Sequence, residues 1–330
     1  MDLLTYLIVF ILFYIVFYIV SIPVHELGHL VFGLMSGCRF SSFRLLSYVW
    51  YKENSRIKLK KSGNGFMLGQ CLMAPPADEA KFRFVLYNLG GGLFNLLTVA
   101  VLIGIAVLAG DFSPVLIAGI TSSAVTGLMN LIPITVQIPN DGMNVVKALQ
   151  SPQARHGLYV MMLVNDDMIS GKRFRDYDER FFTVPDTADL RNYFAAYILL
   201  CDAARLYDCG LYEACIEKYN TLPLNELPPY YRNSVNLDYL YHYCVHRPDH
   251  DKARELYAQR DMKKYLNAPL PMVSRALTAY EFFVCGDREK AGEYLKKAKA
   301  QIDSFPSKGF QMMETDYLTH LEGLMQSSRP

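Results

Sequence analysis

The first apolar run of the chain constrains the fold most. Residues 3–22 read LLTYLIVFILFYIVFYIVSI, twenty positions without a charged side chain. An α-helix of that length is about 30 Å long, which matches the hydrocarbon core of a bilayer. Two more apolar runs extend from Phe84 to Ala109 and from Pro114 to about Pro133. The N-terminal half is therefore predicted to contain three transmembrane helices.

A cleaved signal peptide is the alternative interpretation of the first run. It fits poorly, because no basic residue precedes the apolar core, the core is long, and no small-residue cleavage site follows it. We therefore expect the first helix to be retained.

Charge distribution predicts how the chain crosses the membrane. Residues 37–83, between the first two apolar runs, contain nine Lys or Arg and three acidic residues, so the positive-inside rule predicts a cytoplasmic loop. Three spans then place the N-terminus and the turn at 110–113 outside and the C-terminal half in the cytoplasm, as expected for a multi-pass protein of the cell membrane. Seven cysteines without paired spacing agree with a reducing compartment. The net charge of +1 gives no argument for binding nucleic acid.

The basic loop has two segments with strand-like patterns. Residues 56–60 alternate between polar and apolar side chains, and residues 43–51 are rich in aromatic and branched ones. These patterns predict a small β-sheet or hairpin whose apolar face would rest on the membrane surface. A solvated basic loop that only sets the topology is the alternative.

Residues 191–330 show a faint repeat of helix, turn and helix. Ala214, Ala253 and Ala291 follow similar turn segments at intervals of 39 and 38 residues. This period predicts a soluble α-helical, tetratricopeptide-like domain, with an irregular helical bundle as the alternative. We expect residues 1–150 to form the membrane domain and residues 151–190 to form a linker with one short helix.

A histidine pair lies just after the first apolar run. His25, Glu26 and His29 form an H-E-x-x-H motif, in which helical spacing brings both imidazoles to one face. They could hold a zinc ion while Glu26 acts as the base for its water. Ionisable side chains within an apolar helix usually mark a functional site, although a plain pair of helix-end histidines is the alternative.

A catalytic zinc site needs a third protein ligand, and residues 130–142, NLIPITVQIPNDG, supply a candidate after the third apolar run. H-E-x-x-H at the end of one membrane helix, followed by Asn-x-x-Pro and Asp-Gly after a later one, resembles the site-2 protease family. The resemblance covers residues 1–150 and implies that Asp141 is the third zinc ligand. The expected topology brings both helix ends to the cytoplasmic side. Seven residues separate Pro133 from Asp141, more than is usual in that family, so we expect an extended loop there. An ordinary Asn-Asp-Gly turn is the alternative.

The resemblance also suggests two residues that bind substrate. The segment GGGLFN at 90–95 is similar to the family's glycine-plus-asparagine segment, so Asn95 would contact substrate backbone or an oxyanion. Asn130 is the second candidate. A role in helix packing is the alternative for Asn95.

His242 and His246 are also four residues apart, but no carboxylate lies between them. We expect packing histidines there rather than a second metal site.

The expected fold is mainly α, with a three-helix membrane domain and a small cytoplasmic β element before the helical-repeat domain. The expected function is that of an intramembrane zinc metalloprotease. Its substrate would be a membrane protein or remnant peptide, cut in or near the transmembrane segment, and its cytoplasmic domain could bind a protein partner. The alternative is a non-catalytic membrane anchor whose helical repeats recruit a partner. A carrier is disfavoured by three spans without an inverted repeat.

Overall fold

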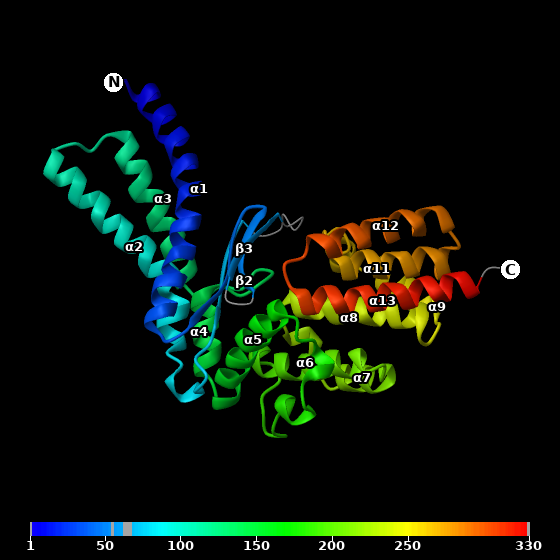
Figure 1. Ribbon diagram of the computed structural model, residues 1–330. Helices are drawn as coiled ribbons and strands as arrows, with labels where there is room; N and C mark the ends of the chain where they lie inside the picture. Colours follow the sequence, from blue (N-terminus) through cyan, green and yellow to red (C-terminus); the bar gives the residue numbers. More distant parts are fainter. Residues whose placement is uncertain (1, 54–55, 62–67, 329–330) are drawn as a thin grey trace. The chain divides into compact units, whose positions relative to one another are not determined.

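A computed structural model describes residues 2–53, 56–61 and 68–328 (Figure 1). The chain forms two compact units that interleave in sequence. Unit 1 comprises Met1–Leu46 and Leu68–Ser151, and unit 2 comprises Ser47–Met67 and Pro152–Pro330. The boundary at residue 151 lies where the sequence becomes polar, whereas the middle of the basic loop groups with the C-terminal half.

Unit 1 is built on three helices that are long and apolar enough to cross a membrane. They are α1 (Leu3–Met35), α2 (Phe84–Ala109) and α3 (Pro114–Leu131), and each packs against the other two. Much of the outward surface of α1 is aliphatic, with Ile8, Ile11 and Ile15 each more than half exposed. Such a surface suits lipid better than water. The three predicted apolar helices are confirmed, and α1 extends 13 residues beyond the run that predicts it.

A strand pair and two short helices lie next to these spans in unit 1. Strands β1 (Arg39–Leu45) and β4 (Gly69–Ala74) pair antiparallel, with Phe43 opposite Cys71, and both contact α1. Cys71 and Met73 of β4 are buried. The short helices are η1 (Glu79–Lys81) and α4 (Asp141–Leu149), and the longer α5 (Pro152–Ser170) begins the C-terminal segment of unit 2.

Unit 2 contains the second strand pair, β2 (Tyr48–Glu53) and β3 (Arg56–Lys61), again antiparallel, with Trp50 opposite Leu59. The predicted small β-sheet is therefore confirmed. The remaining elements of this unit are η2 (Phe174–Asp176), η3 (Glu179–Phe182), α6 (Tyr193–Asp208), α7 (Tyr212–Asn220), η4 (Leu224–Glu226), α8 (Pro229–Val245), α9 (His250–Ala258), α10 (Arg260–Tyr265), α11 (Pro271–Ala279), the π-helical η5 (Tyr280–Cys285), α12 (Arg288–Ser304) and α13 (Lys308–Ser327).

The segment expected to be a linker, residues 151–190, contributes to the core of unit 2. Val160 and Val164 of α5 are fully buried, as is Phe182 of η3, and α5 packs against α6 and α13. The mixed charges of residues 176–186, interrupted by Pro185, favour a linker when the sequence is considered alone. The apolar side chains between those charges point inward instead, so this segment is an ordered part of the unit.

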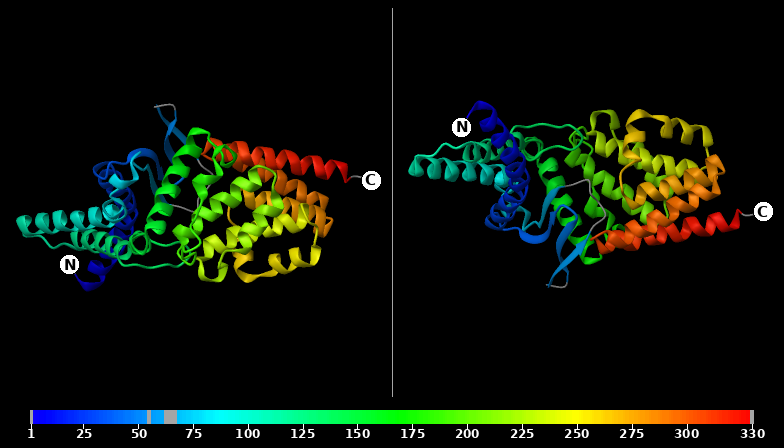
Figure 2. Two further views of the ribbon diagram at one scale, coloured as in Figure 1. Left: turned by 90° about the horizontal axis from the view of Figure 1, so that it is seen from below. Right: turned by 90° about the horizontal axis from the view of Figure 1, so that it is seen from above.

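Three helix pairs follow one another in unit 2: α6 with α7, α8 with α9, and α11 and η5 with α12. Gly210 and Gly286 have positive φ angles of 80° and 73° in two of the connecting turns, a conformation that glycine adopts without strain. Ala253 and Ala291 are fully buried in the second helices of their pairs. Figure 2 shows α13, in red, along one edge of the helices of this unit. The mainly helical architecture is confirmed, and assignment to a tetratricopeptide-type array stays a prediction.

Candidate metal centre

Helix α1 carries three chemically active side chains in a buried position. His25, Glu26 and His29 are 7%, 9% and 7% exposed. His25 lies about 33 Å along the helix from Leu3, close to the full thickness of a hydrocarbon core.

Asp141, the first residue of α4, meets both imidazoles. Its Oδ2 lies 3.0 Å from His25 Nε2 and 3.1 Å from His29 Nε2, and the two Nε2 atoms are 3.1 Å apart. Tetrahedral zinc bound about 2.0–2.1 Å from such ligands separates neighbouring ligand atoms by about 3.3 Å. The three atoms, from residues up to 116 positions apart in sequence, thus form a triangle close to the size that zinc requires.

Hydrogen bonding fixes the state of His29. Its Nδ1 lies 3.0 Å from the backbone carbonyl oxygen of Tyr87, which can only accept, so Nδ1 carries the proton and donates. A metal ion that replaced the proton on Nε2 would then be held by the Nε2 lone pair, next to the Asp141 carboxylate. A backbone carbonyl behind a ligating histidine is also the usual outer partner in metal sites.

The environment of Asp141 favours the charged carboxylate that metal binding needs. Burial alone would raise the pKa of Asp141, but without a metal the charge of a protonated His29 and hydrogen bonds from both imidazoles lower this pKa below the usual value. His25 Nδ1 is buried and has no hydrogen-bond partner among the described residues.

Asn140 fixes the position of Asp141, a role that its Asn-Asp-Gly sequence does not reveal. Its Oδ1 accepts hydrogen bonds from the backbone amides of Met143, as the N-cap of α4, and of Ile134. Its Nδ2 donates to the carbonyl oxygens of Met129 and Ile132. One side chain thus joins the end of α3, the loop after it and the start of α4. The extended loop expected before Asp141 is present, closed by a bridge between residues 135 and 139.

Two glycines of α2 and one of α1 allow these helices to approach each other beside the candidate metal ligands. A Cβ atom on Gly91 would lie 2.5 Å from His25 Cε1 and 2.7 Å from His29 Nε2. A Cβ on Gly90 would meet Phe32, and one on Gly28 of α1 would meet the Gly90 carbonyl at 2.4 Å. Side chains longer than hydrogen are therefore excluded where α2 crosses α1, beside the two imidazoles.

Glu26 faces the start of β4. A Cβ on Gly69 would lie 2.8 Å from Glu26 Oε1, so the carboxylate packs directly on the strand backbone. Glu26 directly follows His25 in the chain, and its carboxylate is close enough to interact electrostatically with His25, His29 and Asp141, as a candidate catalytic base would.

The two asparagines expected to bind substrate have helix-packing contacts. Asn95 is fully buried, and its Nδ2 lies 3.4 Å from the Ser21 carbonyl oxygen of α1, while its Oδ1 has no partner within the described ranges. Asn130 is partly exposed, and its Nδ2 donates to the Thr126 carbonyl one turn earlier at 3.0 Å. A role in binding substrate stays a prediction for both residues.

His242 and His246 of unit 2 are packed among aromatic rings. His246 stacks on Tyr212 with ring centroids 3.6 Å apart, and its Nε2 lies 3.1 Å from the Tyr207 hydroxyl. Burial lowers the pKa of His246 to about 3, which keeps its ring neutral. Among the described residues, only His25, His29 and Asp141 form a group suited to a metal.

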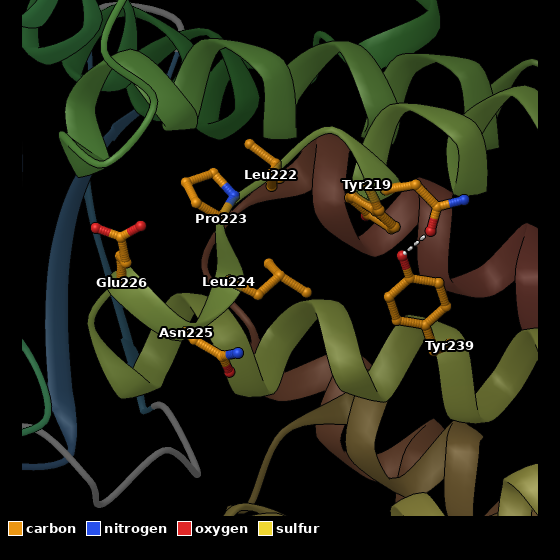
Figure 3. Close-up of a pocket in the computed structure, with 8 residues that line it drawn as sticks. Tyr219, Leu222, Pro223, Leu224, Asn225, Glu226 and Tyr239 are labelled. Carbon is orange, nitrogen blue, oxygen red and sulfur yellow. Dashed lines mark hydrogen bonds between the residues drawn. The ribbon is translucent and has the colours of Figure 1, made fainter.

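Unit 2 also has a surface pocket of about 380 Å³ between the end of α7 and α8 (Figure 3). Tyr239 donates a hydrogen bond to Asn220 Oδ1 at one side of it, 2.7 Å long. Leu222, Pro223 and Leu224 provide an apolar wall. The pocket contains none of the metal-ligating residues.

In comparisons with known proteins, no family model, no curated protein and no solved structure matches the chain.

Proposed function

We propose that the chain is a zinc-dependent peptidase of the site-2 protease type, which cuts a membrane protein or remnant peptide in or near its transmembrane segment. The observation that carries the proposal is the triangle of His25, His29 and Asp141, with ligand atoms 3.0 to 3.1 Å apart and Glu26 beside it. Two imidazoles, one carboxylate and one open position are the ligand set of a catalytic zinc site.

The chemistry proposed for these residues is peptide hydrolysis. Zinc bound there would supply a Lewis acid that polarises the scissile carbonyl and lowers the pKa of a water molecule. Glu26 would accept the proton of the attacking water and return it to the leaving amine. The Tyr87 carbonyl, by holding the Nδ1 proton of His29, would keep Nε2 available as a ligand.

The surrounding helices support a substrate that is itself embedded in a membrane. The site lies on an apolar helix whose outer side chains are exposed, near the position where the hydrocarbon core would end. A substrate helix would have to unwind there to expose a carbonyl, and water would have a short path to it. By the positive-inside rule, the positive charge of the loop at 37–83 supports a cytoplasmic position for this boundary, with the N-terminus outside.

Unit 2 would provide recognition. Its successive helix pairs resemble a tetratricopeptide-type array, which commonly binds protein segments. We propose that it binds the cytoplasmic segment of the substrate or a regulator.

The test compares zinc content and cleavage in purified full-length protein, with a library of single-span peptides in detergent or bilayers as substrate. We expect Glu26→Gln to keep its zinc and to lose cleavage by a factor of at least about 100, as expected for removal of a general base. His29→Ala should lose both. Glu289→Gln, which changes an exposed glutamate on α12, is the matched control and should keep both.

The alternative function, a membrane anchor with a vestigial metal site, predicts a different pattern. Wild type would bind zinc and cut none of the peptides, and Glu26→Gln would behave like wild type in every assay. The burial of a carboxylate between two metal-ligating histidines argues against this alternative, because a structural site has no use for a base.

A further inference from the structure

The hairpin of β2 and β3 has two different faces, defined by its register. Residues directly opposite one another share a face, so Val49 and Lys60 lie on one side and Trp50 and Leu59 on the other. The first side, the inner face, packs against the helices of unit 2. Val49 is 2% exposed, and Lys60 Nζ donates to the Phe305 carbonyl oxygen at 2.9 Å.

The outer face bears Tyr48, Trp50, Lys52, Ile57, Leu59 and Lys61. Ile57 and Leu59 are 66% and 57% exposed, and Tyr48 is 48% exposed. Lys52 and Lys61 are exposed at its margins. The outer face thus has two aliphatic side chains in its middle. Two aromatic side chains lie beside them, and two lysines lie at the edges.

This composition fits a lipid surface better than a protein. Tryptophan and tyrosine concentrate at membrane interfaces, where an apolar ring lies among lipid chains and its polar atom meets headgroups. Lysines beside them attract anionic headgroups, each contributing a favourable surface interaction. The inner face carries the acidic residue of the hairpin, Glu53, paired with Lys58 at 2.6 Å, so the outer face presents positive charge alone.

The covalent chain keeps the hairpin near a bilayer that holds α1. Helix α1 ends at Met35, and the hairpin begins at Tyr48. The twelve residues between them span at most about 40 Å even when fully extended. A bilayer surface is therefore always within reach of the outer face.

We propose that the outer face of this hairpin docks onto the anionic headgroup region of the bilayer that contains α1, with Ile57 and Leu59 entering the acyl boundary. Docking would attach unit 2 to the membrane at a point separate from the transmembrane helices. The inference does not depend on zinc or on peptidase activity, and it can hold or fail independently of the proposed function.

Trp50 is the single tryptophan of the chain and lies on this face, where it is partly buried, so a change in its quenching reports what covers the face. Full-length protein is reconstituted into nanodiscs of equal parts phosphatidylcholine and phosphatidylglycerol, with and without bromine on the acyl chains. We expect brominated lipid to quench Trp50 emission and dissolved acrylamide to quench it weakly. The double variant Ile57→Asp and Leu59→Asp should reverse this order, and nanodiscs of phosphatidylcholine alone should weaken quenching by bromine.

Leu211→Asp is the matched control, since it places the same charge on a leucine of unit 2 that is 53% exposed away from the hairpin. It should leave both quenching profiles unchanged. Two results would overturn the proposal. In one, acrylamide quenches Trp50 strongly and brominated lipid does not. In the other, Trp50 is shielded from both quenchers, which would assign the outer face to a protein contact or a second copy of the chain.

Discussion

Gly91 lies against the imidazoles of His25 and His29, and because it has no side chain it leaves room for both rings. We predict that Gly91→Ala weakens zinc binding by about 10- to 100-fold, the usual range when groups that orient metal ligands are disturbed. The added methyl group would lie within 2.7 Å of atoms in both rings, so at least one ring must turn away from Asp141. Competition with a chromophoric chelator measures this change in affinity.

Gly104→Ala is the control on the same helix, because a Cβ atom there meets nothing within 4 Å. It should bind zinc like the unchanged protein, and its helix should be slightly stabilised by the better helix former. Equal zinc affinities for the two variants would show that the imidazoles do not depend on the close approach of α2.

At the scale of secondary-structure elements, the metal centre depends on how α3, the loop after it and α4 are joined. We predict that Asn140→Ala lowers the free energy of unfolding by about 1–2 kcal/mol through loss of the helix cap. It should also weaken zinc binding, because four hydrogen bonds that fix the position before Asp141 are lost. Thermal unfolding with and without zinc separates the two effects.

Asp287→Ala removes a comparable N-cap from α12, where Asp287 accepts a hydrogen bond from the Lys290 amide at 3.0 Å. This control should lower stability similarly and leave zinc affinity unchanged. A loss of zinc affinity in both variants would mean that general destabilisation, rather than the position of Asp141, explains the result.

The sequence predicted what depends on local pattern. Uninterrupted apolar runs determine α1, α2 and α3, and helical spacing determines that His25 and His29 share a face. It could not predict what depends on packing across the chain. The role of Gly91 requires knowing which side of α2 meets α1. In the sequence, Asn140 is typical of an ordinary turn. Its hydrogen bonds to Met129 of α3 and Met143 of α4 form only when the loop folds back.

The same distinction applies to α5. Its apolar residues have helical spacing, but the charged segment after it suggested a linker, because burial against α6 and α13 is set by residues far away in sequence. The interleaving of the two units, with residues 47–67 belonging to the second, is likewise a property of tertiary contacts.

At the scale of the whole molecule, a buried ionic network connects distant parts of unit 2. Asp208, at the end of α6, accepts hydrogen bonds from the Arg173 guanidinium, the Arg175 backbone amide and the Tyr317 hydroxyl of α13. Arg173 is 6% exposed and Asp208 5%. Removing one charge leaves the other buried without its main partner, so we predict that Asp208→Asn destabilises the protein by about 3 kcal/mol.

The network also predicts a pH dependence. Burial would raise the pKa of Asp208, but hydrogen bonds and charge from Arg173 and Arg175 lower it below the usual value. The folded protein therefore binds this proton less tightly than the unfolded chain, whose aspartates titrate near pH 3.9. The stabilisation is present above that pH and is lost as pH falls through the lower, folded pKa.

Urea unfolding of the full-length protein in mild detergent, followed through Trp50 in unit 2, measures both effects. Asp178→Asn is the control, because Asp178 forms an exposed pair with Arg180. The control should keep the wild-type midpoint, and Asp208→Asn should lose most of the acid dependence. An unchanged midpoint for Asp208→Asn would show that the network adds nothing to stability.

The place of His25 along α1 determines what happens to a severed polypeptide under the proposed function. A substrate cut at the depth of His25, about one hydrocarbon thickness from the outer end of α1, would leave few apolar residues on the cytoplasmic fragment. Each methylene group kept in lipid retains a fragment by only about 0.8 kcal/mol, so a short apolar stub gives weak, reversible attachment. The liberated piece would diffuse into the cytosol unaided, and the reaction would act as a one-way release of a tethered protein.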